Sequence, residues 1–241
     1  MIFEKSIEMA HGSTISVDNN YYSKNEIPTN NLDNRKDYWN FYYQNQSKTP
    51  PSQFAAFIAS EYPDHELIID VGCGNGRDTI FFAQLGYNTV GIDGSKSAIE
   101  HCQKMMAGYD RNSDANIFIE KDVSDLSNNI QQIIKSPAIK KIIYSRFFLH
   151  AINEYEEQEF LDFAFSSINA EDRIALEFRT NLDEHKEKVT GKHYRRYIDT
   201  SIFIEHVTKK YNAKLMYCIE GTGFAKYKND DAHVCRIILA K

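Results

Sequence analysis

Five short, largely apolar runs, each with a polar or acidic residue at or next to its end, recur in the part of the chain that follows residue 60. A strand that is buried on both faces of a parallel sheet has such a continuous apolar sequence. Segments of helical length separate most of the runs, which predicts an α/β fold with a largely parallel sheet. The expected strands are Leu67–Val71, Asn88–Asp93, Ile117–Val123, Lys141–His150 and Arg173–Thr180.

Helical spacing of apolar residues precedes the first of these strands. Phe54, Phe57 and Ile58 share one face of a helix, and Pro51 suits its first turn. A second helix is predicted over residues 97–106, between the second and third strands.

The N-terminal region has a different pattern. Residues 16–37 are rich in Asn, Asp, Ser and Tyr, so we expect a mobile or ligand-ordered segment there. An aromatic cluster over residues 38–43 contains the only tryptophan, Trp39. Two interpretations of the cluster stay open: a helix that packs its aromatic side chains on the core, or a lid over a ligand site.

A glycine-rich turn follows the first strand directly. Asp70 ends the apolar run, and Gly72, Gly74 and Gly76 form a G-x-G-x-G pattern in which the backbone can turn tightly and approach a ligand. Asp93 ends the second strand, where its carboxylate can accept hydrogen bonds from two ribose hydroxyls. The pattern indicates a nucleotide-type cofactor site, the alternative being a tight turn without a ligand.

Two residues distinguish between adenosine cofactors. The dinucleotide fingerprint G-x-G-x-x-G requires glycine where this chain has Arg77. The carboxylate of Asp70 would repel a pyrophosphate, whereas it suits an ammonium or sulfonium group. S-adenosylmethionine carries both of these cationic groups, so we predict it as the cofactor.

With D-V-G-C-G-N-G and the acid at position 93, the chain resembles the class I S-adenosylmethionine-dependent methyltransferases. The resemblance implies a Rossmann-like α/β fold: a seven-stranded methyltransferase sheet with helices on both faces, a terminal hairpin from Ala213–Glu220 and Val234–Ala240, and an N-terminal helical lid. We expect a flexible segment and lid helix over residues 1–60 and the methyltransferase domain over 61–241. The expected cofactor-binding residues are Asp70, Gly72, Cys73, Gly74, Asn75, Gly76, Asp93, Gly94, Ser95, Asp122, Val123 and Ser145.

Two of these roles, at Asp122 and Val123, rest on the resemblance alone. Asp122 matches the position whose side chain accepts from the adenine amino group, and the backbone of Val123 faces the ring. The alternative for Asp122 is an exposed turn residue or a helix cap.

Candidate catalytic residues lie after the fourth and fifth strands. His193, His150 and Asp183 are candidate bases in that order, since a base near neutral pKa can take a proton as the methyl arrives. The resemblance also implies a packing role for a histidine at position 150. An acceptor that is already ionised would need no base.

A local basic cluster indicates the acceptor. Arg179, Lys192, Arg195 and Arg196 lie near His193, and guanidinium groups match phosphate or carboxylate geometry. The alternative is a solvated basic turn. The expected substrate-binding residues are Tyr38, Tyr42, Tyr43, Arg146, Arg179, Tyr194, Arg195 and Arg196.

Three short motifs are similar to a bacterial subgroup that takes part in capsule and surface-glycan biosynthesis. They are S-R-F-F-L-H-A-I, E-F-R-T and H-Y-R-R-Y. The resemblance implies a phosphorylated, phosphoramidate or nucleotide-linked sugar acceptor that is methylated on oxygen or nitrogen.

The composition of the chain excludes some classes of function and of partner. A net charge of −6 and a pI near 5.8 argue against a nucleic-acid partner. The cysteines form no C-x-x-C pair, and no spacing predicts a metal site. No run approaches the ~18 apolar residues of a membrane span, so we expect a cytoplasmic protein with a small-molecule acceptor. An NAD-dependent oxidoreductase and a non-catalytic cofactor-binding partner protein stay as alternatives.

Overall fold

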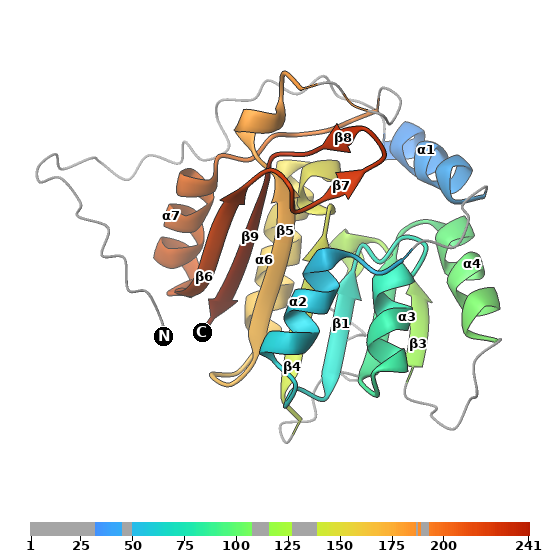
Figure 1. Cartoon of the computed structure of the whole chain (residues 1–241), viewed down its shortest axis with the longest axis horizontal. Helices are drawn as coiled ribbons and strands as arrows, with labels where there is room; N and C mark the ends of the chain where they lie inside the picture. Colours follow the sequence, from blue (N-terminus) through green and yellow to red (C-terminus); the bar gives the residue numbers. More distant parts are fainter. Residues whose placement is uncertain (1–31, 45–49, 108–115, 127–138, 187, 189–192) are drawn as a thin grey trace, which may run out of the picture.

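The computed structural model describes residues 32–44, 50–107, 116–126, 139–186, 188 and 193–241. Its centre is a seven-stranded sheet in the order β3-β2-β1-β4-β5-β9-β6 (Figure 1). The strands are β1 Leu67–Val71, β2 Asn88–Asp93, β3 Asn116–Glu120, β4 Lys141–Arg146, β5 Arg173–Arg179, β6 Lys214–Gly221 and β9 Val234–Ala240.

Strand direction explains where a ligand can bind. The strands β1 to β5 are parallel to one another, and β9 is antiparallel to both β5 and β6. Because β1 lies between β2 and β4, the strand order reverses at β1, and open α/β sheets bind ligands at the carboxyl end of such a point. The glycine turn comes directly after β1 and therefore lies at this end.

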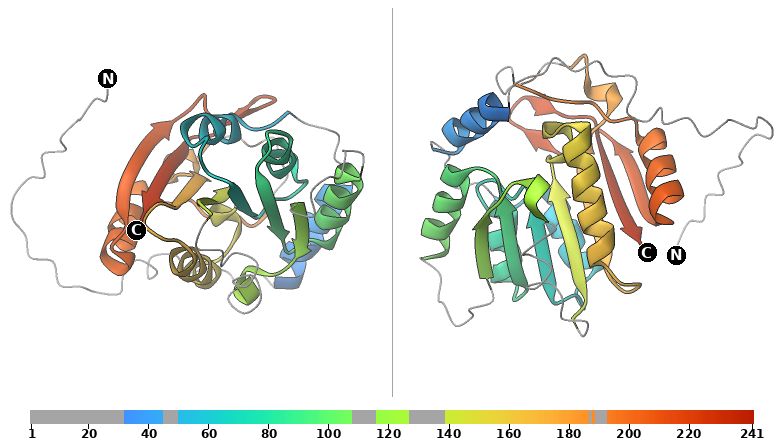
Figure 2. Two further views of the ribbon diagram at one scale, coloured as in Figure 1. Left: turned by 90° about the horizontal axis from the view of Figure 1, so that it is seen from below. Right: turned by 180° about the vertical axis from the view of Figure 1, so that it is seen from behind.

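Helices cover both faces of the sheet, as the sequence predicts. The helices α2 (Gln53–Glu61) and α3 (Arg77–Gln84) lie on one face, whereas α6 (Glu154–Ser167) and α7 (Thr200–Tyr211) lie on the other (Figures 1 and 2). The helix α4 (Lys96–Met106) packs beside β3. No helix in the described ranges is long and apolar enough to cross a bilayer.

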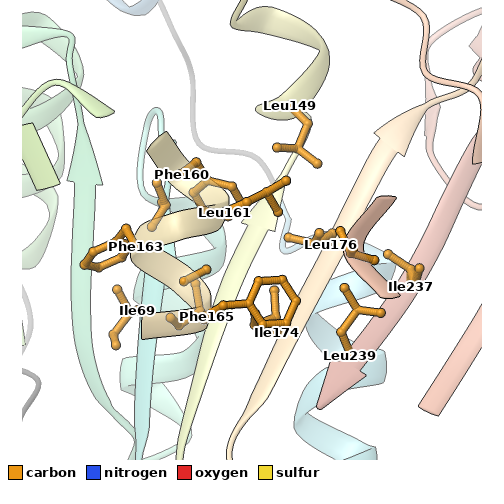
Figure 3. Packing of buried hydrophobic residues seen from close by; sticks show 14 of the residues in the cluster. Ile69, Leu149, Phe160, Leu161, Phe163, Phe165, Ile174, Leu176, Ile237 and Leu239 are labelled. Carbon is orange, nitrogen blue, oxygen red and sulfur yellow. The ribbon is translucent and has the colours of Figure 1, made fainter. Parts of the chain in front are cut away.

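The core follows the alternation of side chains along the strands. Ile69, Ile174 and Leu176 point toward α6, where they pack against Phe160 and Leu161 (Figure 3). Ile68 and Tyr144 point to the opposite face and pack with Phe54 and Ile58 of α2, the apolar face that the sequence predicts. Burial on both faces accounts for the uninterrupted apolar runs of the central strands.

Two smaller elements lie at the carboxyl end of the sheet. The helix α1 spans Leu32–Gln44, and the hairpin of β7 (Lys226–Tyr227) and β8 (Asp230–Asp231) connects β6 to β9. Figure 1 shows both above the ends of the parallel strands.

Three boundaries differ by two or more residues from the sequence-based prediction. The strand β4 ends at Arg146 and not at His150, because Phe147 has a left-handed backbone (φ 58°) and the short 3-10 helix Leu149–Ala151 follows. The third strand ends at Glu120, before the 3-10 helix Val123–Asp125. Helix α2 begins at Gln53 with Ser52 as its N-cap, so Pro51 precedes the helix.

The expected mobile segment is also partly helical. Residues 32–37 of the predicted segment 16–37 belong to α1, and residues 16–31 lie outside the described residues.

Candidate functional site

The glycine turn after β1 has the backbone conformation that its sequence predicts. Gly72 and Gly74 have φ values of 75° and 54°, in the left-handed region that side chains disfavour. A Cβ atom on Gly74 would lie 2.4 Å from the hydroxyl oxygen of Tyr43, and one on Gly72 would lie 2.4 Å from the ring of Phe148. The glycines are therefore required both by backbone conformation and by the aromatic rings that pack on the turn.

Asp93 is bound to this turn. One carboxylate oxygen accepts from the backbone N–H of Gly74 at 2.8 Å, and the other accepts from the backbone N–H of Ser95 at 2.8 Å. Burial raises the pKa of Asp93, although the two N–H donors act in the opposite direction. Each oxygen has a further lone pair beyond the one used here.

Asp70 lies beneath the turn. Its side chain is 2% exposed and accepts a hydrogen bond of 2.6 Å from the hydroxyl of Thr79. Burial raises the pKa of Asp70 to about 8, and the neighbouring carboxylate of Asp78 contributes in the same direction. In the absence of a cation, this carboxyl group is therefore largely protonated at neutral pH.

A cavity of about 290 Å³ adjoins the turn at the carboxyl end of the sheet. Ten of the twelve expected cofactor-binding residues line it; Gly76 and Ser145 do not. Ser145 is buried and donates to the carbonyl of Val71 at 2.8 Å, which ties β4 to the end of β1. The ten are Asp70, Gly72, Cys73, Gly74, Asn75, Asp93, Gly94, Ser95, Asp122 and Val123.

Helix α1 covers this cavity through contacts with three separate segments. Arg35 makes a bidentate ion pair with Glu156 at the start of α6, with N–O distances of 2.7 and 2.8 Å. Lys36 pairs with Asp122 at 2.6 Å, and the side-chain oxygen of Asn40 accepts from the hydroxyl of Ser95 at 2.7 Å. All of these partners follow a parallel strand or begin a helix beside the cavity.

Four of the five aromatic side chains of α1 face the cavity, whereas Phe41 is exposed. Tyr38, Tyr42 and Tyr43 line it together with Trp39. Tyr38 stacks on the ring of His193 with a centroid distance of 4.4 Å, and the ring of Trp39 meets that of His193 edge-on at 5.4 Å. The helix and residue 193 thus form one continuous wall.

His193 and Arg195 lie together on this wall. A guanidinium nitrogen of Arg195 is 3.1 Å from the Nε2 atom of His193, and both residues line the cavity. Lys192, which the sequence places in the same cluster, lies outside the described residues.

His150 also lines the cavity, but its hydrogen bonding does not suit a base. Its Nδ1 atom accepts from the backbone N–H of Arg179 at 3.3 Å, which places the proton of the neutral ring on Nε2. Burial lowers the pKa of His150 well below its usual value, and the nearby charge of Arg179 adds to the effect. A neutral His150 with this tautomer can donate a hydrogen bond but has no ring lone pair left for a proton.

Three residues predicted for the site lie away from the cavity. Asp183 is fully buried, accepts from Arg179 at 2.5 Å and from the backbone N–H of His233 at 2.8 Å, and does not line the cavity. Arg196 is held by Glu157 and by the carbonyl of Ile152, so it fastens the turn after β4. Tyr194 lies on the guanidinium of Arg35 and is likewise absent from the cavity wall.

The remaining predicted arginines line the cavity but hold acidic partners. Arg146 pairs with Glu177 at 2.6 Å, and Arg179 pairs with both Asp183 and Asp230. Of the arginines predicted to converge on one anion beside His193, Arg179 thus holds two carboxylates and Arg196 lies away from the cavity, so Arg195 is the one that lines the cavity beside His193.

Sequence reasoning missed the hairpin side of the cavity. Phe147, Lys226, Tyr227 and Asp230 all line it. The two strands of the hairpin have only two residues each, too few for a recognisable alternation. The sequence Lys-Asn-Asp-Asp over 228–231 indicates a turn, but it does not indicate which ligand or residue the turn faces.

Comparison with known proteins agrees with the fold and the turn. Residues 68–168 match the family described as "Methyltransferase domain". YqeM of Bacillus subtilis (strain 168), a methyltransferase by name, is 26% identical over 86 residues, which are 36% of this chain and 33% of YqeM. The match thus spans about a third of the length of that curated relative.

Solved structures share the architecture at low identity. A SAM-dependent methyltransferase from Anabaena variabilis ATCC 29413 has a TM-score of 0.60 and 19% identity over 87% of this chain and 95% of its own. Magnesium protoporphyrin IX methyltransferase (ChlM) from Synechocystis PCC 6803, with bound SAM, has a TM-score of 0.53 and 15% identity over 77% and 75%. The glycopeptide N-methyltransferase MtfA, complexed with SAM, has a TM-score of 0.59 and 12% identity over 79% and 94%.

The strand order and the domain match agree on the fold and on one domain within the chain. The chain has the fold of the solved S-adenosylmethionine-dependent methyltransferases. Within the chain, residues 68–168 are the part that matches the methyltransferase domain itself.

Proposed function

We propose that this protein transfers the methyl group of S-adenosylmethionine to an oxygen or nitrogen of a small anionic acceptor. One observation carries the proposal: a single cavity is bounded on one side by the glycine turn with Asp93, and on another by Arg195 with His193. The residues that we propose for the cofactor and those that we propose for the acceptor line the same cavity, which supports direct transfer between two bound molecules.

The residues near the turn fit the cofactor. The lone pairs that Asp93 retains suit the ribose hydroxyls, and the carboxyl of Asp70 suits a cationic group, which would favour its ionised form. Asp122 lines the same cavity and suits the adenine amino group. When bound, the cofactor supplies an electrophilic methyl group on a sulfonium.

The cationic side chains on the acceptor side of the cavity favour an anionic acceptor. Arg195 lines the cavity beside His193, and Arg146 lines it with its guanidinium 4.3 Å from the ring centroid of Phe147. A guanidinium next to an aromatic wall suits a phosphate or carboxylate carried on a small organic group. Arg179 holds two carboxylates and therefore contributes less charge than the sequence suggests.

Catalysis in this proposal depends mainly on how the acceptor and the cofactor are positioned relative to each other. Holding a nucleophile in line with the methyl group and excluding water are worth roughly 7 kcal/mol or more. His193 is the first candidate for a base, but the guanidinium of Arg195 can only donate to its Nε2 atom at 3.1 Å, so His193 can take a proton there only once Arg195 turns to the anionic acceptor. A phosphate-type oxygen would already be ionised and would need no base.

A place in capsule or surface-glycan biosynthesis rests on the motif resemblance alone. It makes phosphorylated sugars, nucleotide-linked sugars and phosphoramidates the first acceptors to test.

The proposal is tested by measuring S-adenosylhomocysteine release on sugar phosphates, nucleotide-linked sugars, nucleotide phosphoramidates and uncharged sugars, with cofactor binding measured in the same samples. Turnover confined to the anionic acceptors is the expected result. Turnover on uncharged sugars alone would contradict the anionic acceptor, whereas cofactor binding without turnover on any of them would favour a non-catalytic partner protein.

A further inference from the structure

The β7–β8 hairpin is fixed to the sheet beside the acceptor side of the cavity. Ala225, Ala232 and Val234 form a small apolar cluster with Phe147 and Phe224, which anchors both ends of the hairpin. Figure 1 shows the hairpin at the same end of the sheet as α1. A side chain on this hairpin is therefore held in place relative to the cavity.

Asp230 is the buried acid of the hairpin. Its side chain lines the cavity but is only 4% exposed. One oxygen, Oδ2, accepts from a terminal guanidinium nitrogen of Arg179 at 2.8 Å. The other oxygen, Oδ1, is buried and has no hydrogen-bond partner among the described residues.

Two other acids near Asp230, Asp183 and Asp231, differ from it in their hydrogen bonds. Asp183 also pairs with Arg179, but both of its oxygens accept hydrogen bonds and it does not line the cavity. Asp231, next to Asp230 in the chain, accepts from the backbone N–H of Gly223 at 2.7 Å. Burial of a carboxylate oxygen without a donor is unfavourable, so an oxygen of this kind beside a cavity indicates a donor from a ligand.

We infer that Oδ1 of Asp230 accepts a hydrogen bond from the methyl acceptor, and that the acceptor therefore carries a hydroxyl or amine donor in addition to its anionic group. The inference rests on the proposed function, since it places this acceptor in the same cavity. The pair of Arg179 and Asp230 orients the carboxylate, because Arg179 fixes Oδ2 and leaves Oδ1 for the ligand. The hairpin thus selects acceptors that carry a hydrogen-bond donor, whereas Arg195 selects acceptors that carry a negative charge.

The test compares three small phosphates that differ in one group: ethyl phosphate, 2-hydroxyethyl phosphate and 2-aminoethyl phosphate. Each is titrated by ³¹P NMR into the full-length protein saturated with S-adenosylhomocysteine. The variant Asp230→Asn keeps the size of the side chain but removes the charge. Asp183→Asn is the matched control, since it changes the other partner of Arg179 outside the cavity.

We expect the wild-type protein to bind a donor-bearing phosphate about tenfold more tightly than ethyl phosphate, as a hydrogen bond to a charged group predicts. Asp230→Asn should abolish that difference, and Asp183→Asn should keep it. Equal binding of all three phosphates by the wild type, or an unchanged preference in Asp230→Asn, would overturn the role of Asp230 while leaving the anionic acceptor intact. Failure of every phosphate to bind would overturn both proposals, and failure of S-adenosylhomocysteine to bind would count against the cofactor site itself.

Discussion

Asp70 combines two opposing requirements in one residue. Its burial raises the pKa of the carboxyl to about 8, yet its position beneath the glycine turn suits a cation that favours the charged form. Because the folded-state pKa lies above the ordinary value of 3.8, the unfolded chain loses this proton first as the pH rises. The contribution of Asp70 to stability is therefore present below about pH 4 and is lost as the pH rises through 8.

This linkage predicts the behaviour of Asp70→Asn. The variant should unfold at a higher temperature than the wild type in the absence of cofactor, and its advantage should grow between pH 5 and pH 8. Its affinity for S-adenosylmethionine should fall, since the carboxylate is lost. Thermal unfolding at several pH values measures the first effect, and calorimetry the second; an advantage that shrinks with rising pH would contradict the account.

His193 gives a second prediction for a single residue. If the acceptor is already ionised and needs no base, conversion of His193 to Ala should lower acceptor affinity more than turnover, because the ring forms the wall with Arg195 and Tyr38. His185→Ala, a change at an exposed histidine, serves as the control. Steady-state kinetics separates KM from kcat, and a collapse of kcat with unchanged acceptor affinity would instead make His193 the base.

Among the elements, α1 shows what sequence patterns can and cannot predict. The aromatic cluster left two interpretations open, packing on the core or a lid, and the structure places all of its rings except that of Phe41 on the cavity wall. The parallel strands were predictable because burial on both faces leaves an unbroken apolar sequence. The contacts that hold α1 could not be predicted from the sequence, because Arg35 and Glu156 are 121 residues apart in the chain.

The docking of α1 is tested by Arg35→Met. Arg35 and Glu156 are 11% and 8% exposed, so loss of their pair should weaken closure of α1 over the cofactor. We expect affinity for S-adenosylhomocysteine to fall about tenfold, which corresponds to about 1.4 kcal/mol. Lys209→Met, which removes an exposed pair with Glu205, should leave the affinity unchanged. A lower melting temperature with unchanged affinity would make α1 a structural helix and not a lid.

On the scale of the whole molecule, the ion pairs explain why the predicted basic cluster was only partly correct. The chain has 28 Lys and Arg side chains against 34 Asp and Glu side chains, so most buried cations can find an acid. Arg179 and Arg196 do so with Asp230 and Glu157, which come from other segments of the chain. Local sequence shows where a charge lies but not its partner across the fold, and the hairpin acid Asp230 was missed for the same reason.

A buried ion pair at the end of the sheet opposite the cavity allows an effect on stability to be measured apart from an effect on activity. Lys141 and Asp172 are each 3% exposed and lie 3.0 Å apart at the amino ends of β4 and β5. Asp172→Ala should lower the free energy of unfolding by about 3–5 kcal/mol, because it leaves a buried ammonium without a partner. Urea denaturation measures the loss, and activity per folded molecule should stay unchanged. Glu171→Ala, at an exposed acid, should cost less than about 0.5 kcal/mol.

The central claim is that the cavity beside the glycine turn holds S-adenosylmethionine, and direct titration tests it best. Isothermal calorimetry of the full-length protein with S-adenosylmethionine and with NAD should show one site for the first and no binding of the second, since Arg77 stands where a dinucleotide requires glycine. Tighter binding of NAD, or no binding of S-adenosylmethionine, would contradict the account.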